Sequence, residues 1–123
     1  MRIVNLTQHL ATADQIRQGV FDLSPLLRST LVDLLTFVEI PTKEAIERRA
    51  VALVRLLQSS HIMCDSVMIG GAPFLMSELE YQLKLQKFFP RYAFSERVSE
   101  ETVAPDGSVT KTNVFKHVGF VVI

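Results

Sequence analysis

Two polar loop segments of the sequence carry groups that suit the binding of a small ligand. Thr7-Gln8-His9 ends the β-branched, apolar run Arg2–Thr7, and Gly70-Gly71 follows a second apolar run, Asp65–Ile69. A histidine in such a loop can hydrogen-bond a phosphate or act as a general acid or base near neutral pH. Adjacent glycines let the backbone approach a ligand closely, so the two segments together predict a site for an anion.

A purely structural interpretation is open for both segments. Gly70-Gly71 lacks the GxGxxG pattern and the lysine of a Walker motif, and a glycine pair before a helix often forms only a tight turn. His9 can equally hold its own loop in place by binding a backbone carbonyl.

Ser95 and Arg97 form a third candidate. The arginine offers a planar fork of donors to a phosphate or carboxylate, and the serine offers a hydroxyl. Strand alternation places Ser95 and Arg97 on one face and Glu96 on the other, so one charged side chain points toward a covered face. Either the helix layer ends there, or Glu96 and Arg97 pair with neighbouring elements as structural ion pairs.

Helix signals separate these segments along the chain. Thr12 and Gln15 resemble a capping box for a short helix to Arg17 or Gln18, which Gly19 ends. Ser24-Pro25 begins a second helix that must end before Pro41. The predicted apolar stripe of this second helix comprises Leu27, Leu31, Leu34, Leu35 and Val38.

Two more helices follow. Thr42 caps the third, and we interpret the side that carries Arg48 and Arg55 as a solvated face. Pro73 begins the fourth. Its second apolar strip is wider than one core contact needs, and we expect part of it to meet another subunit. That strip comprises Tyr81, Leu85 and Phe88.

The end of the chain reads as a long β-hairpin. The sequence predicts extended backbone over Arg91–Val103 and Ser108–Ile123. Pro105-Asp106-Gly107 between them predicts a turn, because proline fixes φ at its first central position and glycine accepts a positive φ. We predict a core face on the last strand formed by Val114, Val118, Phe120 and Val122. The opposite face, with Lys111, Asn113, Phe115 and His117, is either solvated or part of a polar pocket.

Strands that alternate with helices predict an α/β fold. We expect residues 1–123 to form a single α/β domain, Rossmann-like and three-layered, with a mostly parallel sheet and a C-terminal antiparallel hairpin. Ligands of open α/β sheets bind beyond the carboxyl ends of the strands. If the first two predicted strands are neighbours, their loops share a crevice, and the helix at Pro73 aims its free N–H groups at the same space.

Composition narrows the classes of function. The 123 residues include 13 basic and 13 acidic side chains, and this balance argues against broad nucleic-acid binding. The single Cys64 and the lack of a signal peptide or long apolar run favour a cytoplasmic protein. His9, His61, His117 and Cys64 form no close ligand pair, so we expect no metal site and no cofactor.

Four sequence blocks resemble those of a family of small uncharacterised bacterial proteins. The blocks follow the patterns NLTxH, GGAPFLM, YAFSxR and GSVxKxNVFxHxGF, and they begin at Asn5, Gly70, Tyr92 and Gly107. The resemblance spans nearly the whole chain and implies no activity.

The first strand and the segment Leu10–Gln15 are also similar to the start of small CRISPR-associated proteins with a CARF-like Rossmann fold. This resemblance implies a homodimer that binds, and in some cases cleaves, a cyclic oligoadenylate without metal. It implies ligand contacts from Thr7, His9 and Gly70-Gly71 at a dimer axis.

The sequence therefore supports two functional hypotheses. The first is a domain that binds a nucleotide or another small anion through Thr7, Gln8, His9, Gly70 and Gly71, with Ser95 and Arg97 as further contacts. In its enzymatic form, His9 or Arg97 assists phosphodiester cleavage. The alternative is a non-enzymatic interaction or structural protein that uses the apolar helix strip and the hairpin.

Overall fold

The computed structural model describes residues 1–123 as one five-stranded sheet with four helices. The strands are β1 (Ile3–Leu6), β2 (Val20–Asp22), β3 (Ser66–Ile69), β4 (Phe89–Val103) and β5 (Val109–Val122). The helices are α1 (Ala13–Arg17), α2 (Pro25–Leu35), α3 (Lys43–Ser59) and α4 (Pro73–Leu85). The strand order is β2-β1-β3-β4-β5, parallel except for the antiparallel pair β4–β5, which confirms the predicted α/β class.

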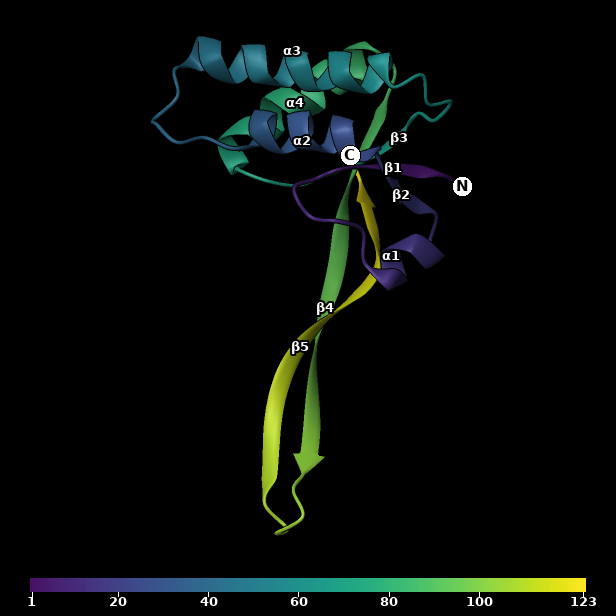
Figure 1. The fold of residues 1–123 in the computed structure, drawn as a ribbon, viewed down its shortest axis with the longest axis vertical. Helices are drawn as coiled ribbons and strands as arrows, with labels where there is room; N and C mark the ends of the chain where they lie inside the picture. Colours follow the sequence, from purple (N-terminus) through teal and green to yellow (C-terminus); the bar gives the residue numbers. More distant parts are fainter.

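The main core lies between the sheet and three helices. Helices α2, α3 and α4 lie together on one side of the sheet (Figure 1). Alternate strand residues point toward them, as the period of two in a strand requires. The strand side chains in this core are Val4, Leu6, Val67 and Ile69, and the helices contribute Leu31, Leu35, Leu53, Leu57, Leu75 and Leu79 among others.

The helix boundaries follow local capping chemistry. The side chain of Thr42 accepts a hydrogen bond from the N–H of Ala45 at 3.1 Å, and Thr12 with Gln15 forms the predicted capping box. Helix α2 ends at Leu35, earlier than its predicted stripe, and Val38 is 91% exposed. The prediction that Val38 belongs to the core stripe is therefore wrong. None of the four helices is both long and apolar enough to span a bilayer.

The opposite face of the sheet has a much thinner cover. Ile3, Val20 and Met68 form a small cluster there, against which Ala11 and Phe120 pack. Helix α1 is the one helix on this side (Figure 1). The expected three layers are present, but the second helical layer is a single short helix.

Strand β2 is absent from the sequence-based prediction. It has three residues and pairs in parallel with β1, with Val20 beside Ile3. Gly19 directly before it adopts φ +100°, and a Cβ atom there would lie 2.0 Å from the carbonyl oxygen of Met1. This close approach explains why glycine stands at the entrance to β2.

The hairpin extends far beyond the body of the domain (Figure 1). Only the first part of β4, from Phe89 to Tyr92, pairs with β3. The predicted turn is present, with Gly107 at φ +89° and an N–H···O bond of 2.8 Å from Ala104 to Ser108. Hydrogen bonds from the hydroxyl and N–H of Ser108 hold the pKa of Asp106 below its ordinary value.

The predicted core face of β5 is wrong. Val114 and Val118 are 36% and 48% exposed, because no helix layer covers the ribbon, and Val122, opposite Arg91 on the edge strand of the sheet, is 62% exposed. Phe120 alone of that set packs against a core cluster. A register shift at Phe94/Ser95 also interrupts the ladder between β4 and β5. Alternate residues therefore do not share one face along the whole length of the hairpin.

His117 joins the hairpin to α1. Its Nε2 lies 2.8 Å from Oε1 of Gln18, and its ring packs edge-on against Phe120 at 5.0 Å between centroids. Gln18 also donates to the carbonyl oxygen of Val118 at 3.0 Å. Nδ1 of His117 is buried and has no partner, whereas Nε2 faces Oε1 of Gln18, so the proton of the neutral ring lies on Nε2.

Burial lowers the pKa of His117 below its ordinary value of 6.5. The unfolded chain therefore binds a proton at this ring more readily than the folded chain does, and stability falls as pH drops below about 6.5. Chemical denaturation between about pH 7.5 and pH 5.5 should show a smaller fall for His117→Gln than for the wild type. Equal slopes in the two proteins would contradict this assignment.

Candidate functional site

A cavity of about 590 Å³ lies at the carboxyl ends of β1 and β3, beside Tyr92 and Ala93 in the first part of β4. Because β1 and β3 pair directly, the loops that leave them are brought side by side, as the sequence predicts. Five of the seven predicted ligand-binding residues line this cavity, namely Thr7, Gln8, His9, Gly70 and Gly71. Thr12 and Gln15 of the α1 capping box, with Leu10, Met68, Ile69, Tyr92 and Ala93, complete the lining.

The side chain of Asn5 organises the loop that supplies half of this wall. Asn5 is fully buried on β1, and its Nδ2 donates to the carbonyl oxygen of His9 at 2.8 Å and to Oδ1 of Asp22 at 2.7 Å. Its Oδ1 accepts from the backbone N–H of Thr7 at 2.9 Å and from the Thr7 hydroxyl at 2.7 Å. One amide therefore fixes the path of the backbone from Thr7 to His9.

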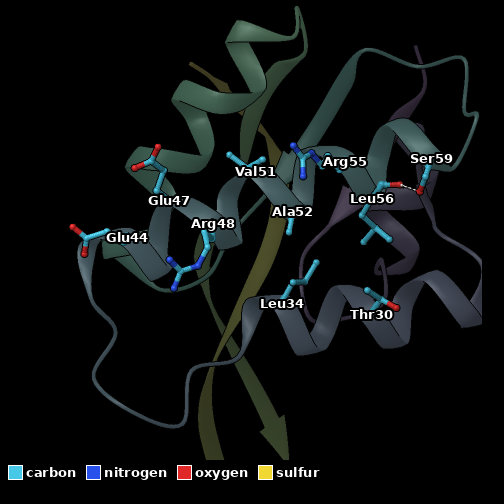
Figure 2. A pocket seen from close by; sticks show the side chains of 10 residues that line it. All are labelled: Thr30, Leu34, Glu44, Glu47, Arg48, Val51, Ala52, Arg55, Leu56 and Ser59. Atoms are coloured by element: carbon cyan, nitrogen blue, oxygen red, sulfur yellow. Dashed lines mark hydrogen bonds between the residues drawn. The ribbon is translucent and has the colours of Figure 1, made fainter.

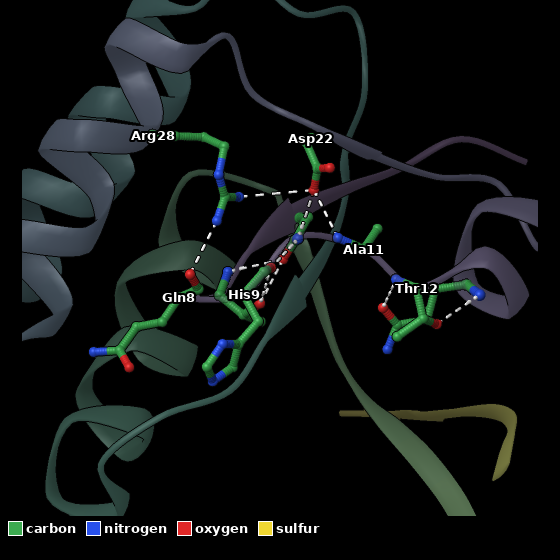
Figure 3. Close-up of polar contacts among 9 residues, drawn as sticks. Gln8, His9, Ala11, Thr12, Asp22 and Arg28 are labelled. Atoms are coloured by element: carbon green, nitrogen blue, oxygen red, sulfur yellow. Dashed lines mark hydrogen bonds and ion pairs between the residues drawn. The ribbon is translucent and has the colours of Figure 1, made fainter.

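Asp22 and Arg28 also form hydrogen bonds with backbone groups of this loop (Figure 3). Oδ1 of Asp22 also accepts from the N–H of Ala11 at 3.0 Å. The Arg28 guanidinium donates to the carbonyl oxygen of Gln8 at 3.0 Å and lies 3.7 Å from Asp22. Strand β2 thus places the Asp22 carboxylate beside the loop that follows β1, where it stabilises the conformation of that loop.

These contacts define what Thr7 can offer a ligand. Both its N–H and its hydroxyl proton point at Oδ1 of Asn5, so neither is free to donate to an anion. Thr7 therefore acts as a positioning residue for the loop, while its hydroxyl oxygen can still accept a hydrogen bond.

Other groups of the wall are free to donate. The backbone N–H groups of Gln8, His9 and Gly71 make no hydrogen bond within the protein. The His9 ring likewise has no partner, and Figure 3 shows it directed away from Asp22 and Arg28. Two loops therefore present unpaired donors at one cavity, an arrangement that favours an anionic or hydrogen-bond-accepting ligand.

The helix beginning at Pro73 contributes less than the sequence suggests. The cavity lining ends at Gly71 and includes neither Pro73 nor Phe74. The ring of Phe74 packs edge-on against Phe37, with 5.1 Å between the centroids. The expectation that the first turn of α4 faces the cavity is therefore not met, and the donors come from the loops.

The two glycines have different backbone requirements. Gly71 adopts φ +153°, a conformation that L side chains rarely adopt, and a Cβ there would lie 3.4 Å from Cε of Met76. Gly70 shows no such φ, and a Cβ would make an ordinary contact of 3.6 Å with Cγ2 of Thr7. The loop therefore needs glycine at Gly71 for its backbone, whereas Gly70 keeps space open in the cavity wall.

The wall carries no Asp, Glu, Lys or Arg side chain. Tyr92 donates its hydroxyl to Oε2 of Glu80 at 2.9 Å, and burial, followed by this contact, raises its pKa well above the ordinary value. His9 is the one lining side chain suited to proton transfer near neutral pH. No three His, Cys, Asp or Glu side chains gather as a metal site requires.

Ser95 and Arg97 lie outside the cavity. Both are exposed on the projecting ribbon, where Ser95 pairs with His117 and Arg97 with Phe115 on β5. Glu96 and Arg97 form no ion pair in the chain. The sequence left two interpretations of these charges open, an end of the helix layer or structural ion pairs. The structure shows the first, because the helix layer ends before the ribbon begins (Figure 1).

A larger hollow, about 880 Å³, lies between α2 and α3 (Figure 2). Its rim carries both signs of charge, Glu44 and Glu47 beside Arg48 and Arg55, above an apolar floor that includes Leu34. All of its residues come from two helices, and no loop that ends a strand contributes to it. This groove matches the predicted solvated face of α3, and we favour the smaller cavity as the functional site.

Sequence reasoning missed the residues that support the site. Asn5 is a polar residue inside the buried run Ile3–Leu6, and a polar residue at such a position is the one local sign that its side chain has a specific hydrogen-bonding role. Asp22 and Arg28 have no comparable local pattern, because their roles depend on β2 pairing with β1.

The fold and the cavity define an α/β protein with an open, mostly parallel sheet and a ligand-sized hollow at the carboxyl ends of its strands. The chain belongs to the Uncharacterized protein MJ1673 family, whose model matches residues 1–121. No curated protein and no solved structure is significantly similar to the chain.

Replacing Asn5 tests its role in the loop. Asn5→Ala leaves the Thr7 N–H without its acceptor and removes one donor each from the His9 carbonyl and the Asp22 carboxylate, and a buried group left unpaired costs about 1–3 kcal/mol. We expect a loss of about 3 kcal/mol in the free energy of unfolding. Gln8→Ala removes only an exposed contact of 3.3 Å to Thr36 and should change it by less than about 0.5 kcal/mol. Similar values for the two variants would refute the central role of Asn5.

The glycine pair gives a second comparison. Gly71→Ala forces a side chain into a strained backbone conformation and should destabilise the protein by about 1–3 kcal/mol. Gly70→Ala should stay within about 0.5 kcal/mol of the wild type. Urea denaturation measures both, and a reversed order would show that the loop backbone differs from the one described.

Proposed function

We propose that the protein binds a small anionic ligand, a nucleotide or a cyclic oligonucleotide, in the cavity at the carboxyl ends of β1 and β3. The observation that carries this proposal is the convergence of unpaired donors from two loops. These are the N–H groups of Gln8, His9 and Gly71, together with the His9 ring.

The electrostatics of the wall are compatible with an anion. No carboxylate lines the cavity to repel a phosphate, and the Glu80 carboxylate near it is engaged by Tyr92. A phosphate bound to backbone N–H groups needs no lysine or arginine, since oriented amides alone form anion sites. Overall charge neutrality fits a ligand recognised locally rather than by a broad basic surface.

The remaining wall suits the other half of a nucleotide. Leu10, Met68, Ile69 and Ala93 are apolar, and Tyr92 presents an aromatic ring beside them. A volume of about 590 Å³ falls within the range of small-molecule sites. A nucleobase can lie on the apolar side while the phosphate meets the loop donors. The CARF-like resemblance of the first strand supports the same ligand class.

In its enzymatic form, the site would cleave a ribonucleotide phosphodiester without a metal ion. The 2′-hydroxyl of the ligand would attack the adjacent phosphorus and displace the 5′-oxygen of the next nucleotide, giving a 2′,3′-cyclic phosphate. His9 would take the proton of the attacking hydroxyl and return it to the leaving oxygen, and the loop N–H groups would stabilise the charge that develops on the phosphate. Arg97 of the same chain lies outside the cavity, so His9 carries this role alone within one subunit. We expect His9→Ala to abolish turnover while leaving the melting temperature of the free protein close to that of the wild type.

Ligand-dependent thermal stability tests the binding proposal. AMP, inorganic phosphate and a cyclic oligoadenylate should be titrated separately, because a ligand at 100 times its Kd stabilises the folded state by about 2.7 kcal/mol. Gly70→Leu, which fills the cavity wall beside Thr7, and His9→Ala should each reduce the shift. His61→Asn is the matched control, because His61 lies in the loop before β3, outside the cavity. No shift with any of the three ligands would overturn the proposal.

A protein-interaction role is the second candidate, favoured by the exposure of Tyr81 (57%) and Leu85 (53%) on α4. Phe88, the third member of that strip, packs instead against the main core. If the strip binds another protein, Leu85→Glu should abolish the recovery of that partner, while Ser29→Glu at an exposed position on α2 should retain it. Equal recovery by the two variants would exclude the strip as the binding surface.

A further inference from the structure

The edge of β4 on the side of β3 has no strand partner over most of its length. Strand β3 covers only Phe89–Tyr92, and from Ala93 to Val103 the strand is bonded to β5 alone. A long strand edge with free N–H and C=O groups is a template for another strand, and proteins limit such pairing with charged side chains, prolines, bulges or a covering element. The sequence from Ala93 to Val103 contains no proline, and no element covers it.

The ribbon also has too little support of its own. Phe115, Val103 and Val109 are 75%, 67% and 55% exposed, and the described contacts with the body stop near His117 and Val118. An isolated two-stranded ribbon is at best marginally stable in water, whereas three or more strands with an apolar face are stable. The ribbon would gain that stability by pairing with a further strand.

The charges distinguish the two edges of the ribbon. Strand β5 carries Lys111 and Lys116 and no acidic residue, so two copies of β5 would place only positive charges together. Strand β4 carries Arg97 among Glu96, Glu100 and Glu101, so two copies of β4 can match opposite charges. Opposite charges across a strand pair stabilise it, and like charges destabilise it.

We propose that β4 pairs antiparallel with β4 of a second copy of this chain, around a two-fold axis at Ser99. In this register Arg97 stands opposite Glu101 of the second copy, and the pair occurs twice. The same register sets Ser95 opposite Val103, so the paired segment runs from the register shift at Phe94/Ser95 to the last residue of β4. An isologous interface of this kind closes as a dimer.

Arg97 has no ion-pair partner within its own chain, so it is available to pair with Glu101 of a second copy. Its guanidinium makes no hydrogen bond or ion pair in the chain, although it is one of the candidate ligand groups in the sequence. Glu101 lies 3.5 Å from Nζ of Lys111 across the ribbon. Each Glu101 would therefore stand between Lys111 of its own chain and Arg97 of the other, and the two ribbons would form one four-stranded sheet.

Disulfide trapping tests the axis position. In a Cys64→Ser background, Ser99→Cys should cross-link to its copy under mild oxidation, because directly opposite residues have Cα atoms about 4.5–5.5 Å apart. Asn113→Cys is the matched control. It lies opposite Ser99 on β5, on the far side of the ribbon from the proposed pair, and three strand spacings of about 4.8 Å would separate it from its copy. It should stay un-cross-linked.

Charge reversal tests the register. Light scattering should give the wild type twice the 13.9 kDa mass of one chain, and Arg97→Glu should give the single-chain mass. Adding Glu101→Arg and Lys111→Glu to Arg97→Glu reverses every charge in the row and should restore the double mass. Lys116→Gln on β5 should leave the double mass unchanged, and circular dichroism should show each variant folded.

Three results would overturn the proposal. They are a wild type that is monomeric at a concentration of about 100 μM, where even a weak dimer is populated, cross-linking through Asn113→Cys in place of Ser99→Cys, and a dimer that Arg97→Glu leaves intact. Ligand binding at the cavity is measured separately, so failure of the dimer leaves the proposed function standing.

Discussion

The four hydrogen bonds of the buried Asn5 amide are the constraint on which the candidate site depends. They join β1 to β2 through Asp22 and fix the backbone of the loop from Thr7 to His9. A buried amide is costly unless its donors and acceptors are all paired, so the loop has little freedom to adopt another path. Within this fixed loop, the N–H groups of Gln8 and His9 make no hydrogen bond to the rest of the chain.

The second organising feature is the unequal cover of the sheet. Three helices pack on one face, while α1 alone lies on the other, and β4 continues beyond both layers (Figure 1). The body can be stable through its helix-covered core, whereas the projecting ribbon has its own ladder and, at its base, the contacts of Gln18 with His117 and Val118. The proposed ligand site and the proposed dimer surface therefore belong to different parts of the molecule, one fixed by burial and one left open.

Much of the fold follows from local sequence signals. The caps at Thr12 and Thr42, the prolines at Pro25 and Pro73 and the Pro105–Gly107 turn each act through the backbone of a few neighbouring residues, and the structure contains all of them. The α/β class follows from their order. Strand β2 escaped prediction because three residues give no periodicity, and Val38 was misplaced because an apolar residue at helical spacing is not buried where the helix has already ended.

The sequence by itself determined which loops end the parallel strands, and so brought Thr7, Gln8, His9, Gly70 and Gly71 into consideration. Only the tertiary structure decided that these loops share one cavity, because that requires β1 and β3 to be neighbours. It also decided that Ser95, Arg97 and the predicted β5 core lie on an uncovered ribbon. Strand alternation reports which side chains share a face, but whether a face is buried depends on the helices that reach it, and these end before the ribbon begins.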